Sequence, residues 1–370
     1  MLDTISVVQI LNDFYGQGLT PRSNVKQLSI RSPFRDDEHP SFTIYLDTNT
    51  AYDWGTRESF DNITLIERAL GVSRNEALRT LNEKYGLSPL SAEQEAAIHR
   101  EFLLQKYVAA TSKYLQPEHI SAIEGRGITQ QVIQSKQCGF HPSGFDGLGI
   151  PELVELGITN DFVGRIILPC HLNGRLVYVV GWDPASKDGK KYVFPANWSR
   201  PIIGTTGDNP LLVGGIFDLW ACELAQIPAI CTLSSNVIKK QNQFLKRLSN
   251  FFVAFDGDRA GKTAANDLAK EHFPRAKAII LPDGEDPNSL YCALGQEKFK
   301  AKIEELKKDA IDPLREALRY VDTAVDQFGA VELLKDVTSL IARLSKAERT
   351  PYVDIIHEKV KRFNISKGSI

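Results

Sequence analysis

The sequence predicts a protein that combines α+β and α/β domains, and three patterns support this. A short apolar run, residues 251–255, stops at Asp256-Gly257-Asp258 and gives way to a helical pattern. That order is typical of a buried parallel strand, a tight acidic turn and a helix. Strand-like and helical segments alternate over residues 211–294, as in a βαβ sheet. Short strand-like pieces in residues 28–60 indicate a separate region before this sheet, and the pattern after residue 296 indicates a helical region after it.

Length and composition set limits on the function. A chain of 370 residues has room for two or three domains. Its 44 basic and 46 acidic residues nearly cancel, which argues against tight nonspecific binding to DNA but not against a local basic groove. The amino terminus lacks the basic start and apolar core of a secretion signal, and no run is long and apolar enough to cross a membrane. The five cysteines form no CxxC pair, so we expect reduced cysteines in a cytoplasmic protein without a membrane partner.

The local patterns predict the order of elements along the chain. In the first part of the chain we expect an amphipathic helix over residues 2–20, a hairpin of residues 41–45 with 51–54, helices over 62–70 and 74–85, and a polar helical linker over 87–116. A second hairpin should pair residues 165–169 with 176–181 around Asn173-Gly174. The βαβ segment follows, and the chain should finish with helices over 331–344 and 350–363.

The acidic turn after residue 255 predicts chemistry. Open α/β sheets bind ligands at the carboxyl ends of their strands, where Asp256 and Asp258 would lie. Carboxylates at such a place suit Mg²⁺, which is usually shared with a substrate phosphate. A second interpretation stays open, since Asp also favours turns and helix N-caps. Residues 257–263 resemble the end of a P-loop but have three residues between the glycines instead of four, so we exclude an ATPase.

Several motifs occur in the same order as in one known family. Residues 256–261 (DGDRAG) and 282–288 (PDGEDPN) resemble the metal-binding loops DGDxAG and PDGEDPD of the bacterial replicative, DnaG-type DNA primases. Residues 125–129 (GRGIT), residues 164–169 (GRIILP) and Lys191-Tyr192 are similar to the first half of that family's polymerase core. The resemblance covers most of the chain and implies a catalytic core with a Toprim fold.

The resemblance also implies a division into domains. It predicts a zinc-ribbon-like domain over residues 1–88, a helical linker over 89–116, the first part of the RNA polymerase core over 117–205, a Toprim domain over 206–300 and a helical carboxyl-terminal subdomain over 301–370. No residues remain for the family's separate helicase-binding domain, so we expect any contact with a replicative helicase to be made differently.

The first domain departs from the family at its metal site. Residues 32–42 (SPFRDDEHPSF) resemble the zinc-ribbon motif CPFHxExxPSF, and the four ligand positions correspond to Ser32, Arg35, Asp53 and Thr56. None of these is Cys or His, the ligands that a structural zinc site requires. We therefore predict a ribbon-like domain that holds no zinc and is stabilised by its aromatic core.

The catalytic core departs from the family as well. Residues 211–218 (LLVGGIFD) align with a Toprim segment that reads VEGxxD, so the family's glutamate is Gly214 here. The resemblance implies that Asp256, Asp258 and Asp286 hold Mg²⁺ or Mn²⁺, and that Asp218, Asp256 and Asp258 are catalytic. Asn288 replaces a further aspartate and carries no charge. Glu223 lies five residues beyond Asp218, too far along its helix to be expected at the same site.

Contacts with nucleic acid are expected in the half of the core that, by resemblance, faces template and primer. Tyr192 is a candidate for stacking on a base. The full set of predicted contacts is Arg126, Arg165, Lys191, Tyr192 and Arg200.

The leading hypothesis is a primase-type protein that makes short RNA primers on single-stranded DNA from ribonucleoside triphosphates, in the replication of a mobile element. A second hypothesis is a degenerate homologue that binds single-stranded DNA or a replisome partner without polymerising. A third is another Toprim activity, such as a nuclease. The missing glutamate at position 214 counts against both enzyme hypotheses.

Overall fold

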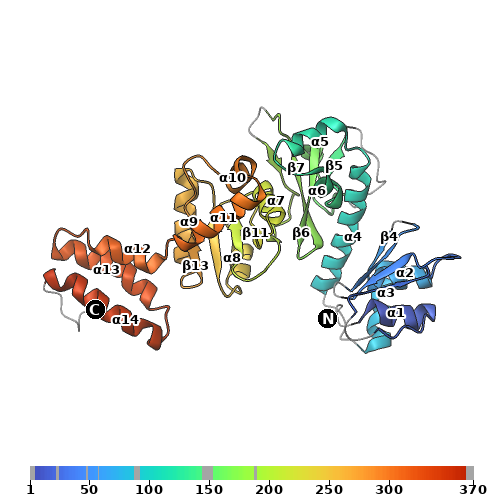
Figure 1. Cartoon of the computed structure of the whole chain (residues 1–370), viewed down its shortest axis with the longest axis horizontal. Coiled ribbons are helices and arrows are strands. Elements are labelled where there is room, and N and C mark those ends of the chain that lie inside the picture. The colour runs from blue at the N-terminus through green and yellow to red at the C-terminus, as the bar shows by residue number, and fades with distance from the viewer. Residues whose placement is uncertain are drawn as a thin grey trace. The chain divides into compact units, whose positions relative to one another are not determined.

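The computed structural model describes residues 5–21, 25–46, 49–56, 58–86, 92–143, 153–186 and 190–363. The chain forms two compact units, Met1–Phe102 and Leu103–Ile370 (Figure 1). The division falls inside α4 (Ala92–Ser112), so the two ends of this helix belong to different units. This helix accounts for the linker predicted over residues 87–116, of which residues 87–91 lie outside the described residues.

The first unit combines an antiparallel sheet, in the strand order β1-β2-β3-β4, with helices. Its elements are α1 (Val7–Tyr15), β1 (Gln27–Ile30), β2 (Phe42–Tyr45), β3 (Thr50–Asp53), β4 (Glu58–Phe60), α2 (Asn62–Leu70) and α3 (Arg74–Tyr85). The predicted hairpin is confirmed by the pairing of β2 with β3, although Asp47 and Thr48 of its turn lie outside the described residues.

Helix α1 is shorter than the helix predicted over residues 2–20. The Ser6 hydroxyl accepts a hydrogen bond from the Gln9 N–H at 3.1 Å and caps the start of the helix. Gly16 ends it in the left-handed conformation, at φ 63°, where glycine meets no steric penalty. The buried side of α1 joins a core that contains Phe34, Phe42 and Phe60.

A mixed sheet organises the second unit, and its described strands follow the order β13-β12-β10-β11-β9-β6-β7-β8, with β5 paired to β6. The strands are β5 (Gly139–His141), β6 (Arg165–Leu172), β7 (Arg175–Trp182), β8 (Tyr192–Val193), β9 (Ile203–Gly204), β10 (Leu211–Val213), β11 (Ala229–Cys231), β12 (Phe251–Ala254) and β13 (Ala276–Ala278). The predicted β6–β7 hairpin is confirmed, and its turn residues Asn173 and Gly174 both have positive φ, as such a tight turn requires.

Helices connect the parallel strands β10, β11, β12 and β13, as the βαβ pattern predicted. The helices of this region are α5 (Pro117–Glu124), α6 (Gln130–Ser135), the 3₁₀ turn η3 (Asn160–Phe162), α7 (Ile216–Leu224), α8 (Lys239–Leu245), α9 (Arg259–Glu271), α10 (Pro287–Leu294) and α11 (Gln296–Lys308). α9 packs against β12 and β13, and α7 packs against α10. These parallel strands end at one edge of the sheet, which gathers the loops that follow them.

The carboxyl-terminal part of the second unit is helical, as predicted. It consists of α12 (Pro313–Val321), α13 (Gln327–Ile341), α14 (Lys346–Val360) and the 3₁₀ turn η4 (Lys361–Phe363). Arg343 on this part donates hydrogen bonds to the carbonyls of Lys270 and Glu271 at the end of α9. Over the described residues, no helix combines the length and the apolar character needed to span a membrane.

Candidate active site

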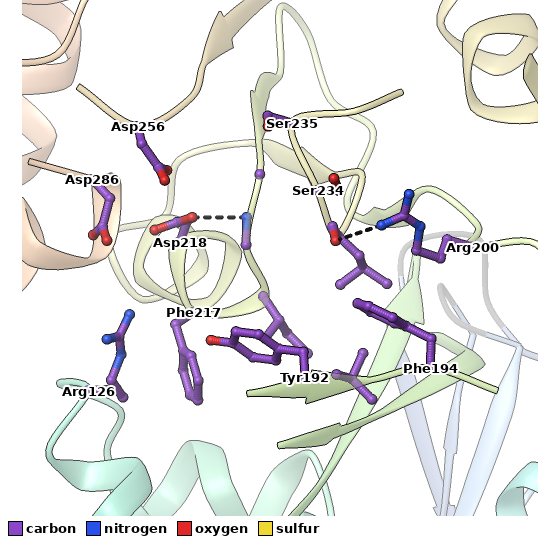
Figure 2. Close-up of a pocket in the computed structure, with 15 residues that line it drawn as sticks. Arg126, Tyr192, Phe194, Arg200, Phe217, Asp218, Ser234, Ser235, Asp256 and Asp286 are labelled. Atoms are coloured by element: carbon purple, nitrogen blue, oxygen red, sulfur yellow. Dashed lines mark hydrogen bonds between the residues drawn. The ribbon is translucent and has the colours of Figure 1, made fainter. Parts of the chain in front are cut away.

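A cavity of about 430 Å³ lies at the carboxyl ends of β10, β11 and β12 (Figure 2). This volume is within the range of small-molecule binding sites in proteins. The lining residues come from the loops after these three strands, from the starts of α7 and α10, from β7 and β8, and from the loops that carry Arg126 and Arg200. They include Arg126, Tyr192, Phe194, Arg200, Gly214, Phe217, Asp218, Ser234, Ser235, Asp256 and Asp286.

Three of the predicted carboxylates line this cavity, and each comes from a different segment. Asp218 lies in the first turn of α7, Asp256 is the second residue after β12, and Asp286 is the N-cap of α10. Gly257 explains how the last two segments approach each other. Its N–H donates to the Glu285 carbonyl at 2.7 Å, and a Cβ at this position would collide with the Pro282 carbonyl.

Two backbone N–H groups fix the orientation of the Asp218 carboxylate. Its Oδ2 accepts from the Gly215 N–H at 2.9 Å, and its Oδ1 accepts from the Asn288 N–H at 3.1 Å. The side chain is 6% exposed. Burial, followed by the negative charge of Asp286, raises the pKa of Asp218 to about 7. Burial and the charge of Asp286 also raise the pKa of Asp256. A cation placed among these groups would relieve this repulsion.

The carboxylates fit a divalent cation that is shared with a substrate. Within the described ranges, no three His, Cys, Asp or Glu side chains form a group that could hold a metal ion alone. Mg²⁺ seldom needs such a group, because one or two carboxylates, water and substrate phosphates usually complete its six ligands. Asp256 and Asp286, on two loops joined through Gly257, would supply the protein's share.

Asp258 has a different position from the other predicted metal ligands. It is the N-cap of α9, and its Oδ1 accepts from the Gly261 N–H at 2.6 Å. It does not line the cavity, although its charge contributes to the raised pKa of Asp256. The turn and helix-cap interpretation therefore describes Asp258 well, and its metal-binding and catalytic roles stay predictions.

Gly214 lines the cavity at the position of the family's glutamate. Its φ is not left-handed, and a Cβ there would meet Phe255 at 3.7 Å and the Ser235 nitrogen at 3.8 Å, which are ordinary contacts. The backbone therefore has room for a side chain. Glu223 does not substitute for it, because it is absent from the cavity lining and pairs with Lys136 at 2.7 Å.

Asn288 connects two parts of the site without entering the cavity. Its side chain is 2% exposed and donates to the Arg126 carbonyl at 2.7 Å, while its backbone N–H holds Asp218. An aspartate could not donate this side-chain hydrogen bond. The asparagine therefore ties the segment of Arg126 to the sheet edge.

Among the predicted nucleic-acid contacts, Arg126, Tyr192 and Arg200 line the cavity. The Arg126 guanidinium lies over the Phe217 ring at 5.0 Å, and its buried Nε has no hydrogen-bond partner among the described residues. Arg165 lies elsewhere and is buried, where it donates to the carbonyls of Asp161 (2.6 Å) and Lys190 (2.7 Å).

Lys191 is exposed and does not line the cavity. The sequence interpretation did not include Phe194, Ser234 or Ser235, which do line it. The two serines could have been expected, because they follow β11, a parallel strand that ends at the same edge as β10.

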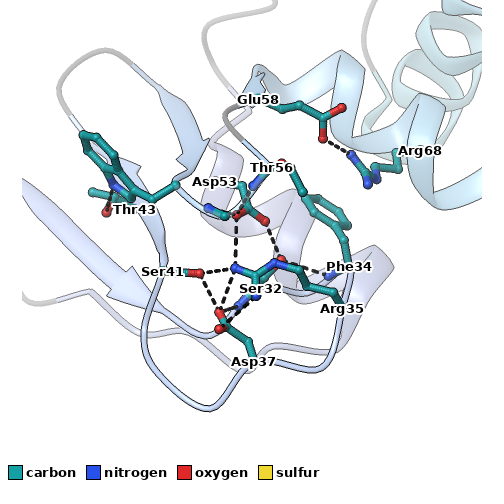
Figure 3. A network of polar contacts seen from close by, with 12 residues as sticks. Ser32, Phe34, Arg35, Asp37, Ser41, Thr43, Asp53, Thr56, Glu58 and Arg68 are labelled. Carbon is teal, nitrogen blue, oxygen red and sulfur yellow. Dashed lines mark hydrogen bonds and ion pairs between the residues drawn. The ribbon is translucent and has the colours of Figure 1, made fainter.

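In the first unit, the four positions that correspond to zinc ligands form one polar cluster (Figure 3). Asp53, which is 0% exposed, is its centre. It accepts hydrogen bonds from the Ser32 hydroxyl at 2.6 Å, the Gly55 N–H at 2.8 Å and the Thr56 N–H at 3.3 Å. Arg35 pairs with Asp53 at 3.3 Å and with Asp37 at 3.0 Å.

The neighbours of Asp53 and Asp37 stabilise the ionised form of both carboxylates. Burial tends to raise the pKa of Asp53, but the hydrogen bonds from Ser32, Gly55 and Thr56 and the contact with Arg35 lower it below its ordinary value. The Ser41 hydroxyl and the Ser32 N–H bind Asp37, and together with Arg35 they lower its pKa to about 2. Both carboxylates are therefore ionised at neutral pH.

Comparison with known proteins agrees with the fold and the site. The family described as Toprim-like matches residues 211–291, the segment from β10 into α10 that supplies all three cavity carboxylates. The second unit therefore contains a Toprim-like domain.

The DNA primase of Escherichia coli (strain K12) is 27% identical over 329 residues, which cover 74% of this chain and 56% of that protein. The chain thus spans about half the length of this curated relative. The crystal structure of the Aquifex aeolicus primase zinc-binding and RNA polymerase domains matches with a TM-score of 0.67 and 17% identity, over 99% of this chain and 96% of that one. The DnaG primase catalytic domain bound to ssDNA matches with a TM-score of 0.60 and 24% identity, over 75% and 99%. The chain has the primase fold and is a homologue of the bacterial DnaG-type DNA primases.

Proposed function

We propose that the protein synthesises short RNA primers on single-stranded DNA from ribonucleoside triphosphates, with Mg²⁺ or Mn²⁺. The observation that carries this proposal is one cavity of a Toprim-like domain that has three carboxylates on one side and arginine and aromatic side chains around it. Phosphoryl transfer needs little more from a protein than positioning of the reactants and compensation of charge.

Each residue predicted for the site has a role in this proposal. Asp256 and Asp286 would hold the cation that neutralises the triphosphate, and Asp218 would assist them from its fixed position. The predicted role of Asp258 as a ligand is retained with less support, because it caps α9. Arg126, Arg200 and Tyr192 would contact the nucleotide or the strands. Lys191 would act at the exposed surface beside Tyr192, while Arg165 would support this segment by holding the Lys190 carbonyl.

The proposal extends to the cofactors and partners. The first unit would fold without zinc, because the charges and hydrogen bonds around Asp53 occupy the four ligand positions. A replicative helicase would be a further partner. Template and ribonucleotides would be met in the cytoplasm.

A second candidate function is a binding protein that occupies single-stranded DNA without polymerising. Gly214 and Asn288 favour it, because both positions lack the carboxylate of the family motif. An assay with labelled ribonucleotides on mixed-sequence single strands, with Mg²⁺ or Mn²⁺ and with or without the cognate helicase, separates the two. RNA products support the primase. Binding of single strands without any product supports the binding protein.

A further inference from the structure

The cavity has two chemically different sides, and only one of them belongs to the proposed metal site. Figure 2 shows Asp218, Asp256 and Asp286 on one side, and the turn with Ser234 and Ser235 across the cavity from Asp286. The serine side has no carboxylate among its lining residues. A ligand that spans the cavity would therefore meet charge at one end and neutral polar groups at the other.

The turn that carries the serines is held in one conformation. Leu233 has a φ of 60°, which is unfavourable for a residue with a side chain and must be maintained by its neighbours. Arg200 donates to the carbonyls of Leu233 at 3.3 Å and Asn236 at 3.5 Å. The Thr232 hydroxyl donates to the Ser234 carbonyl at 2.6 Å. Because the surroundings fix this turn, its hydroxyl groups are positioned before a ligand arrives.

The polar groups on this side remain available to a ligand. The Ser234 hydroxyl accepts from the Asn236 N–H at 3.0 Å, and its own proton is free to be donated. The Ser235 side chain is exposed, and its hydroxyl has no hydrogen bond within the part of the chain that the structure describes. The nitrogen of Ser235 borders the space left by the absent side chain of Gly214, because a Cβ there would lie 3.8 Å from it.

The adjoining wall is aromatic. Phe194 and Tyr192 line the cavity, and the Arg200 guanidinium lies over the Phe194 ring at 5.4 Å. Figure 2 shows Phe194 on the side of Arg200 and Tyr192 between Phe194 and Phe217. Aromatic rings favour stacking with nucleobases. Serine hydroxyls match sugar hydroxyls, because both groups donate and accept hydrogen bonds. Phosphates, in contrast, require the cation on the carboxylate side.

We infer that the serine side is the nucleoside subsite of the cavity, with ribose hydroxyls bound by Ser234 and Ser235 and the base against Tyr192 and Phe194. This inference rests on the proposed function, since it assumes that the cavity takes a nucleoside triphosphate. It makes the serine turn a determinant of the preference for ribonucleotides, because a site that hydrogen-bonds a substrate hydroxyl discriminates against the analogue without it.

The test measures the affinity of the full chain, with Mg²⁺, for ribonucleoside triphosphates and for their 2′,3′-dideoxy analogues by equilibrium dialysis. The wild type should bind the ribonucleotides more tightly. Replacing both serines (Ser234→Ala with Ser235→Ala) should weaken ribonucleotide binding roughly three- to tenfold, the value of one typical hydrogen bond or slightly more, and leave the dideoxy affinity unchanged. Ser249→Ala, at an exposed serine outside the cavity, is the matched control and should behave as the wild type.

Three results would overturn the inference alone. The wild type could bind both kinds of nucleotide equally, or the serine variant could keep the wild-type preference. The variant could also weaken both kinds of nucleotide equally, which would assign the serines a structural role only. Any of these leaves the primase proposal standing if primers are made. A wild type that binds neither kind of nucleotide overturns the inference and the proposed function together.

Discussion

Replacing Asp53 with alanine should strongly destabilise the first unit. The side chain is fully buried and accepts from a hydroxyl, two backbone N–H groups and the Arg35 guanidinium. Its removal leaves the buried Ser32 hydroxyl and two partly buried N–H groups without an acceptor, and a buried donor left unpaired costs about 1–3 kcal/mol. The Arg35 side chain is 32% exposed and can turn to water, so its contribution is smaller. We expect a loss of about 3–5 kcal/mol, the range found when one partner of a buried polar pair is removed.

Hydrogen exchange resolved to individual peptides can locate this loss of stability in the chain. In Asp53→Ala, the amides of β2 and β3 should exchange roughly two to four orders of magnitude faster than in the wild type, as about 3–5 kcal/mol requires. The Toprim-like domain belongs to the other unit and serves as the internal reference. Asp36→Ala is the matched control, because Asp36 is exposed in the same loop. Unchanged protection of β2 and β3 in Asp53→Ala would refute the reasoning.

Four more predictions concern the first unit and the cavity. The first unit should lose stability in acid, because the folded-state pKa values of Asp37 and Asp53 lie below their unfolded values. Their contribution to stability is present above about pH 4 and is lost as the pH falls towards 2. Circular dichroism at graded pH can follow this loss. In contrast to a zinc ribbon, the wild type should unfold at the same temperature with and without a chelator, and about one zinc per chain retained through gel filtration would contradict this. Asp256→Asn should lower Mn²⁺ affinity in calorimetry with little change in fold stability, and identical titrations would show that Asp256 only forms a turn. Gly214→Glu should tighten divalent-ion binding by about 1–3 kcal/mol if the site lacks only that ligand, whereas no gain would show that the cation is held without this position.

The local pattern placed Asp256 at the carboxyl end of a buried strand, and the family resemblance added Asp218 and Asp286. The apolar run before Asp256 and the alternation of strands and helices imply parallel strands whose carboxyl ends meet. In the structure, Asp218, Asp256 and Asp286 line one cavity. A side chain would fit at Gly214 without strain. This agrees with the interpretation that glycine replaces a glutamate here and is not required by a special turn.

Other features depended on contacts between residues distant in sequence. Arg165 is buried because two carbonyls receive its guanidinium, one of them 25 residues away. Asn288 binds the Arg126 carbonyl across 162 residues, which no local pattern encodes. For the first unit, the sequence indicated an aromatic core, and Phe34, Phe42 and Phe60 pack together there. It did not indicate that the replaced ligand positions themselves assemble into hydrogen bonds and ion pairs around Asp53.

Formation of the first phosphodiester bond tests the central claim most directly. The measurement follows labelled dinucleotide formation on mixed-sequence single-stranded DNA with Mn²⁺, for the wild type, Asp286→Asn and Asp283→Asn. Asparagine retains the N-cap of α10, so Asp286→Asn removes a charge from the cavity without removing the helix cap. Asp283 lies in the same loop with its side chain 95% exposed and outside the cavity. We predict product from the wild type and from Asp283→Asn, and a loss of at least about tenfold in Asp286→Asn. No product from the wild type, or equal product from all three, would contradict the account.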